Sequence, residues 1–182
     1  MARIPQVGKF KFNDYDKSTY EVRDFGKAEP LDQMRVNFET MDEKRKKKYV
    51  DGIKAMIRKS LEYKKFISFL KDSLDMNECT FFEQINTKKR NIRIEIHHEP
   101  FTLTDLVYTA IQYTVDMGEE VVDFDIAQLV MYWHYCGLIG LIPLSKTVHE
   151  LVHSGKVFIP LFFPDGDVVS FYTEYKKYMS DN

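Results

Sequence analysis

The chain has 182 residues and a formal net charge of −2, with 26 Lys and Arg against 28 Asp and Glu. Hydrophobic residues make up 44% and charged residues 30%, which excludes wholesale disorder and is typical of a folded protein. The balanced charge provides no overall basic field, so any contact with nucleic acid depends on local basic patches. Cys79 and Cys136 cannot form a disulfide framework or an all-cysteine zinc site, and we expect buried thiols in a reducing compartment.

Targeting and membrane segments are not predicted. The N-terminal residues lack the apolar core of a signal peptide, and no run of about 18 apolar residues could form a transmembrane helix. We therefore expect an intracellular protein without a membrane partner.

The first 77 residues are expected to form an N-terminal extension. Scattered aromatic residues in 1–40 favour short strands or extended cover and indicate no function. Residues 41–75 are predicted to be one long helix that begins with the basic run 44–48. That run is either a solvated helix start or a contact for DNA phosphates. The apolar stripe of this helix consists of Tyr49, Ile53, Met56, Ile57, Leu61, Phe66, Leu70 and Leu74.

The pattern then changes to the period of a strand. Residues 92–96 alternate strictly between Ile and charged side chains, which predicts a half-buried strand that leads into His97 and His98 and stops at Pro100. Two helices are expected next, over 102–117 and over 125–136 with Asp125 as N-cap.

The last third of the chain is predicted to contain a short strand, a short helix and a final helix. The apolar run 138–144 is typical of a strand, and Ser145 is a suitable N-cap for a helix that ends at His153. Residues 157–163 are apolar and expected to be extended. Residues 167–179 are predicted to be the C-terminal helix.

Four of the five histidines fall into two tight pairs, His97-His98 and His149-x-x-x-His153. Two histidines four residues apart share one face of a helix and can bind one metal ion. Adjacent residues on a strand point to opposite sides, so His97 and His98 cannot have the same role. One of them can bind the metal and the other can act as a base, because imidazole titrates near neutral pH.

These residues resemble the HNH (ββα-metal) nucleases. The similar segments read EIHHEPFTL at 95–103 and GLIPLSKTVHELVHSGK at 140–156. These two segments are also similar to those of phage-encoded HNH proteins. The resemblance implies that His97, His149 and His153 bind one divalent ion, which would be Mg, Mn, Ni or Zn. It implies that His98 is the general base, activating the water that attacks a DNA phosphodiester.

The sequence departs from the family pattern at three points. Gly140 occupies the position of the family's Asn, whose side chain usually braces the loop between the two strands. The segment between His98 and Gly140 is longer than usual and contains the two predicted helices. The CxxC pair of many HNH proteins is also missing. A catalytically weak or inactive HNH-derived protein that binds DNA or a viral or host protein complex therefore stays open.

The segment 149–153 also reads HExxH, the motif of zinc peptidases, with Glu150 as general base and Glu174 as a third ligand. Two features count against this alternative. The predicted helix begins only about one turn before the motif, and the peptidase hypothesis leaves His97 and His98 without a role.

The sequence as a whole predicts an α+β protein. An HNH-like ββα-metal domain with a helical insertion would cover 78–163, between the N-terminal extension 1–77 and a C-terminal helix in 164–182. The predicted activity is that of a metal-dependent DNA endonuclease, located in the host cytoplasm if the chain is phage-encoded. The oligomeric state stays open. The expected phosphate contacts are Lys88, Lys89, Arg90, Lys146 and Lys156.

Overall fold

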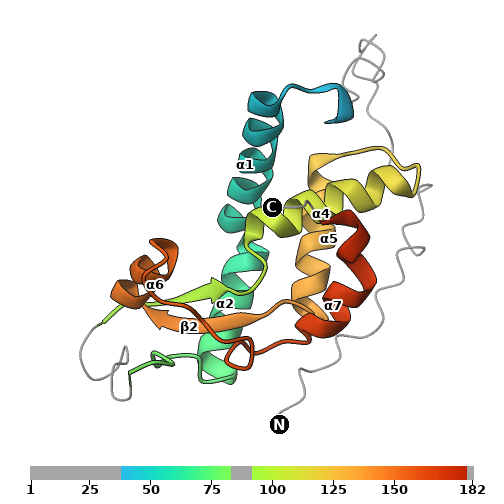
Figure 1. Ribbon diagram of the computed structural model, residues 1–182. Helices are drawn as coiled ribbons and strands as arrows, with labels where there is room; N and C mark the ends of the chain where they lie inside the picture. Colours follow the sequence, from blue (N-terminus) through green and yellow to red (C-terminus); the bar gives the residue numbers. More distant parts are fainter. Residues whose placement is uncertain (1–37, 83–91, 180–182) are drawn as a thin grey trace, which may run out of the picture.

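The computed structural model describes residues 38–82 and 92–179 (Figure 1). This part of the chain is a mixed α+β fold with six α-helices and one two-stranded sheet, so the α+β part of the predicted fold class is confirmed. None of the helices in the described part is both long enough and apolar enough to span a membrane. The expectations for residues 1–37, and for Lys88, Lys89 and Arg90, lie outside the described residues.

The predicted helix over 41–75 is two helices in the structure. A 3-10 turn, η4 (Phe38–Thr40), precedes α1 (Glu43–Lys59) and α2 (Leu61–Ser73). Ser60 separates the two helices because it ends one and begins the other. Its backbone N–H bonds to carbonyls at the end of α1, and its Oγ accepts a hydrogen bond from the backbone N–H of Tyr63, at 3.0 Å. Leu61, expected on the apolar stripe, is consequently 67% exposed.

The two strands are β1 (Ile94–His98) and β2 (Leu141–Ser145), which pair antiparallel with His97 opposite Ile142. Helix α6 (Lys146–His153) follows β2 without a loop. Ser145 caps α6, as predicted, because its side chain accepts a hydrogen bond from the backbone of Val148.

The segment between the strands contains the two predicted helices, α4 (Leu103–Asp116) and α5 (Asp123–Tyr135). Thr102 and Asp105 form a capping box at the start of α4. The prediction of Asp125 as N-cap of α5 is wrong: Val122 holds that position without a side-chain hydrogen bond, and Asp125 lies in the first helical turn.

The C-terminal helix is α7 (Val168–Tyr175), followed by the 3-10 turn η5 (Lys176–Tyr178). Residues 157–163 form no strand with the rest of the described chain, although Ile159 within them is buried. Cys79 is buried as expected, whereas the prediction for Cys136 is wrong, because this residue follows α5 and is exposed.

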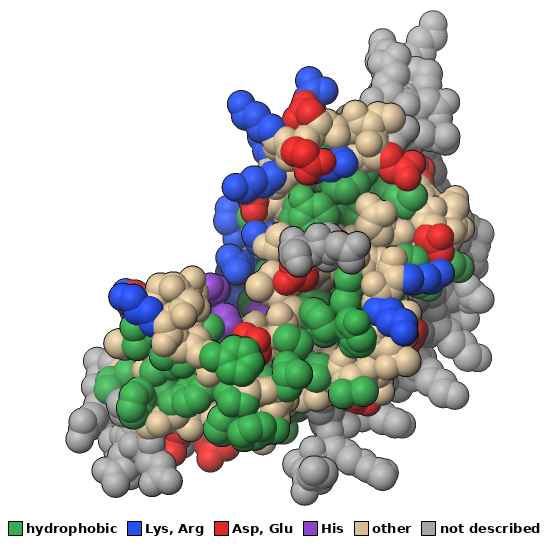
Figure 2. Space-filling view, viewed as in Figure 1, with side chains coloured by type: hydrophobic (Ala, Val, Ile, Leu, Met, Phe, Trp, Pro, Cys, Tyr) green, Lys and Arg blue, Asp and Glu red, His purple; other side chains and the backbone are tan. Residues whose placement is uncertain are grey.

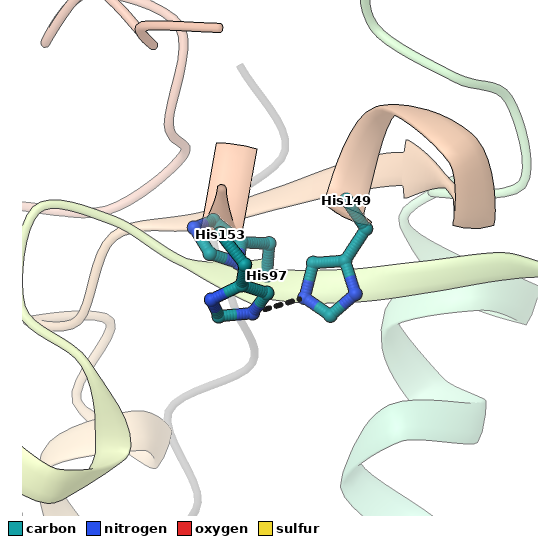
Figure 3. A group of neighbouring side chains, drawn as sticks. All are labelled: His97, His149 and His153. Atoms are coloured by element: carbon teal, nitrogen blue, oxygen red, sulfur yellow. Dashed lines mark hydrogen bonds between the residues drawn. The ribbon is translucent and has the colours of Figure 1, made fainter. Parts of the chain in front are cut away.

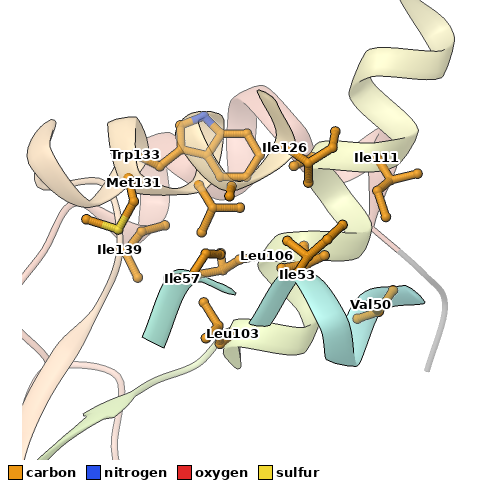
Figure 4. Close-up of a cluster of buried hydrophobic side chains, with 14 of the residues drawn as sticks. Val50, Ile53, Ile57, Leu103, Leu106, Ile111, Ile126, Met131, Trp133 and Ile139 are labelled. Carbon is orange, nitrogen blue, oxygen red and sulfur yellow. The ribbon is translucent and has the colours of Figure 1, made fainter. Parts of the chain in front are cut away.

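The buried apolar residues of the described part form two hydrophobic cores. The larger one joins α1, α4, α5 and α7 around the fully buried Trp133 and Phe171 (Figure 4). The smaller one lies beneath the sheet and α6, and its buried residues are Cys79, Ile94, Ile142, Leu144, Val148 and Ile159. The small strand–strand–helix unit thus lies beside the helical body, with β1 running from one to the other (Figure 1).

Candidate metal centre

Three histidines converge where α6 packs over the sheet (Figure 3). His97 comes from β1, while His149 and His153 lie one turn apart on the same face of α6. One potential ligand atom from each of the three lies within 4.8 Å of the others. Among the described residues this is the only such group of three His, Cys, Asp or Glu side chains, so the three predicted metal ligands are brought together.

Two carboxylates support this cluster from the same strand. Glu95, His97 and Glu99 alternate along β1 and its end, which places them on one side. Glu95 Oε2 lies 2.6 Å from Nδ1 of His149, and Glu99 Oε2 lies 3.3 Å from Nε2 of His97. Sequence reasoning missed both carboxylates, although the i, i+2 spacing around His97 was a readable signal.

The contacts fix how the imidazoles present their nitrogens. A carboxylate only accepts, so Nδ1 of His149 carries the proton and donates it to Glu95. In the neutral ring, Nε2 of His149 has the lone pair and can accept a hydrogen bond from Nε2 of His153, 3.1 Å away. A carboxylate behind a histidine is the usual outer support of a metal-binding imidazole.

Burial favours the neutral form of His97 and His153. Burial, followed by the neighbouring His149 and His153, lowers the pKa of His97 to about 4. Burial and His149 also lower the pKa of His153. Neutral imidazoles are the form that binds metal ions, so burial prepares His97 and His153 for a divalent cation at neutral pH. Three protein ligands also leave a coordination position open, as in catalytic rather than structural sites.

His98 points away from the three histidines and into the protein. It is buried, and its Nε2 lies 2.9 Å from Nε2 of His134 on α5. Nδ1 of His134 lies 2.7 Å from the carbonyl oxygen of Val130, which can only accept. In the neutral pair, Nε2 of His134 therefore accepts and Nε2 of His98 donates. The sequence did not predict the contact of His98 with His134.

Gly140, at the position of the family's Asn, has no room for a side chain. A Cβ there would overlap the carbonyl oxygen of Glu99 and crowd Cγ1 of Val168. The bracing of the loop is instead provided by the backbone, because the N–H of Glu99 donates to the carbonyl of Gly140 at 3.0 Å. The ends of the two strands are thus tied together without an amide side chain.

A cleft of about 440 Å³ opens beside the histidines, between the strand–helix unit and the α1–α2 pair. Figure 2 shows histidine side chains in this hollow, with Lys and Arg side chains along the neighbouring edge of α1. The cleft is lined by Arg58, Tyr63, Ile67, Lys71, Arg93, Ile94, Glu95, Ile96, His97, His98, Thr102, Leu103, His149 and His153.

The remaining predicted site residues lie elsewhere. Lys146 and Lys156 are exposed and are not among the residues that line the cleft. Glu150 is exposed and forms an ion pair with Lys146, at 3.6 Å. Glu174, the third ligand of the peptidase alternative, is exposed on α7 and is not part of the histidine group, which His97 completes.

The fold and the site define a mixed α+β protein with a candidate three-histidine metal centre. The chain belongs to the bacteriophage G278-like virion protein family, whose model matches residues 9–182. Phage origin, implied by the sequence resemblance, is thereby supported. The family description points to a component of the phage particle rather than to the host cytoplasm that the sequence analysis expected. No curated protein and no solved structure matches the chain.

Proposed function

We propose that this chain is a metal-dependent DNA endonuclease that hydrolyses phosphodiester bonds. The observation that carries the proposal is the convergence of His97 on one strand with His149 and His153 on the helix that follows the paired strand. This strand–strand–helix order resembles that of the HNH nucleases, although the segment between the two strands is longer than theirs. The resemblance of this chain to the HNH nucleases rests on the sequence motifs around His97, His149 and His153.

In this proposal, His97, His149 and His153 hold one divalent ion, and Glu95 keeps the His149 ring in place. The bound ion would neutralise charge on the scissile phosphate and stabilise the leaving oxygen. Imidazole ligands suit ions such as Zn and Ni better than Mg, which prefers oxygen ligands.

His98 has the role of general base in this proposal. Because its Nε2 donates to His134, Nδ1 carries the lone pair that accepts the proton from the attacking water. Burial, together with His134, holds the pKa of His98 well below the usual imidazole value, so the ring is neutral near pH 7 and Nδ1 is free of a proton. The same burial makes His98 a weaker base than an exposed imidazole.

A second candidate function is supported by the family and by an exposed apolar surface. The chain belongs to a virion protein family. Three apolar residues of the segment after α6 are largely exposed: Phe158 at 79%, Leu161 at 59% and Phe162 at 80%. Exposed apolar clusters of this kind mark protein contacts. In this alternative the protein binds other particle components, and the histidines hold a structural ion without catalysis.

A plasmid-nicking assay tests the nuclease proposal. Supercoiled DNA is incubated with the wild type and Mg, Mn, Ni or Zn, with a chelator control. We expect metal-dependent nicking that His149→Ala abolishes. His98→Gln keeps an N–H donor for His134 but lacks a basic nitrogen, and we expect it to lower the rate by about 10²- to 10⁴-fold.

Glu150→Gln is the matched control on the same helix. The nuclease proposal predicts unchanged nicking in this variant, because Glu150 faces solvent, whereas a peptidase would lose its general base. Metal bound by a folded wild type that nicks DNA with none of the four ions would contradict the proposal and favour the non-catalytic alternative.

A further inference from the structure

The cleft beside the histidines contains three cationic side chains that come from outside α6. Arg58 lies at the end of α1, Lys71 lies on α2, and Arg93 lies just before β1. Positive charge gathered at a site that would also bind a cation requires an explanation, because like charges in proximity repel. The partners of each side chain show which of them is available to a ligand.

Two of the three cations are already engaged. Lys71 donates from Nζ to the carbonyl oxygen of Ile94 at 2.7 Å. Arg93 pairs through Nε with Oε1 of Glu95 at 3.0 Å, the same carboxylate that holds His149. The first contact ties β1 to α2, the second lies along β1 itself, and together they account for the two charges structurally.

Arg58 differs because it forms no hydrogen bond or ion pair with any other residue in 38–82 or 92–179. Asp51, whose pKa it helps to lower, pairs instead with Lys54 at 2.9 Å. The guanidinium is nonetheless at the site, since Arg58 lines the same cleft as His97, His149 and His153. An exposed, unpaired guanidinium at this place can bind an anion.

The shape and charge of this group favour a phosphate. A guanidinium offers a planar fork of donors that matches two oxygens of one phosphate. With a cation bound by the histidines, a phosphate between this cation and Arg58 would be attracted from both sides, and it would remove the repulsion between the two positive charges. Lys47 and Lys54, which act with Arg58 on Asp51, continue the positive charge along that side of α1.

We propose that Arg58 is the phosphate-binding residue of the cleft, and that a DNA strand lies between α1 and α6 with one backbone phosphate held between the guanidinium and the histidine cluster. This inference rests on the proposed nuclease function and assigns part of its substrate site to a helix outside the strand–strand–helix unit.

DNA binding in the presence of a chelator tests this assignment without cleavage. Fluorescence anisotropy with a labelled 20-bp duplex compares the wild type with Arg58→Gln and with Arg45→Gln. The second variant makes the same change on the same helix, about 20 Å away, where Arg45 pairs with Asp42. We expect Arg58→Gln to weaken binding on the order of 10-fold and to lower the salt slope by about one, with Arg45→Gln changing affinity less than about 2-fold.

Arg58→Lys adds a second test, because it keeps the charge and loses the fork. We expect an affinity between those of the wild type and Arg58→Gln. Equal effects of Arg58→Gln and Arg45→Gln would overturn the assignment, and so would a wild type that does not bind DNA or that binds RNA in preference.

The two proposals fail differently. A wild type that binds DNA through Arg58 but cleaves it with none of the four metals keeps the present inference and contradicts the nuclease function. A wild type that nicks DNA while Arg58→Gln leaves both binding and the nicking rate unchanged keeps the nuclease function and overturns the present inference.

Discussion

Nε2 of His98 lies 2.9 Å from Nε2 of His134, so that a hydrogen bond joins the strand of the candidate site to helix α5 in the larger core. Both rings are buried, and Nδ1 of His134 is held by the carbonyl of Val130. A proton added to either ring would place an uncompensated charge in the core. Burial therefore favours the state in which both imidazoles are neutral.

This pair predicts loss of stability in acid. Burial lowers the pKa of His134 from 6.5 to about 4 in the folded protein. Between those two values the unfolded chain binds the extra proton and the folded chain does not, so the free energy of unfolding falls as the pH falls from about 6.5 to about 4. The contribution of His134 is up to about 3 kcal/mol.

Urea denaturation at pH 7, 6 and 5 in a chelator measures this effect. His134→Gln is the matched variant, because its amide oxygen can accept the hydrogen bond of His98 and cannot be protonated. We expect a shallower pH dependence in the variant than in the wild type. Identical slopes for the two proteins would show that His134 does not titrate in this way.

Glu95→Gln is expected to weaken metal binding while leaving the protein folded. The carboxylate fixes the ring of His149 at 2.6 Å, and an amide holds the same ring without negative charge. Loss of such a support costs about 10- to 100-fold in metal affinity. Competition with a chromophoric chelator for Zn measures the change, and Glu150→Gln, on the exposed side of α6, is expected to leave the affinity as it is.

Gly140→Ala is expected to destabilise the fold by about 1–3 kcal/mol, because the added methyl group would overlap the backbone of Glu99. Gly52→Ala on α1 is the control. No atom lies within 4 Å of a Cβ at Gly52, so the same change there should stabilise the protein by about 0.5–1 kcal/mol. Thermal melting of both variants provides the comparison, and equal melting temperatures would contradict the crowding at Gly140.

Ser60→Ala separates the two-helix structure from one continuous helix. Loss of the cap on α2 is expected to cost about 1 kcal/mol, because the backbone N–H of Tyr63 loses its acceptor. In a continuous helix, Ala would instead stabilise the chain, since it is the better helix former. The sign of the change in urea midpoint decides between the two arrangements.

Much of the local structure could be read from the sequence. The alternation before His97 and the cap at Ser145 each indicated their elements correctly, because these signals act within a few residues. The last helix was predicted too long, since α7 ends at Tyr175 and a 3-10 turn follows it. The separation of α1 from α2 at Ser60 was not predicted. The apolar stripe continues across this serine, so the pattern gives no sign that one helix ends and another begins there. The N-cap of α5 was misplaced because Val122 provides no side-chain signal.

The sequence by itself determined the residue types of the candidate site, since four histidines at strand and helix spacings already indicated metal chemistry. Only the tertiary structure decided their partners. Glu95 contacts His149, 54 positions further along the chain, and His98 contacts His134 at a separation of 36. Arg58 reaches the same cleft from a helix outside the strand–strand–helix unit. Such contacts depend on how strands and helices pack, and no local periodicity encodes which distant side chains will share a cleft.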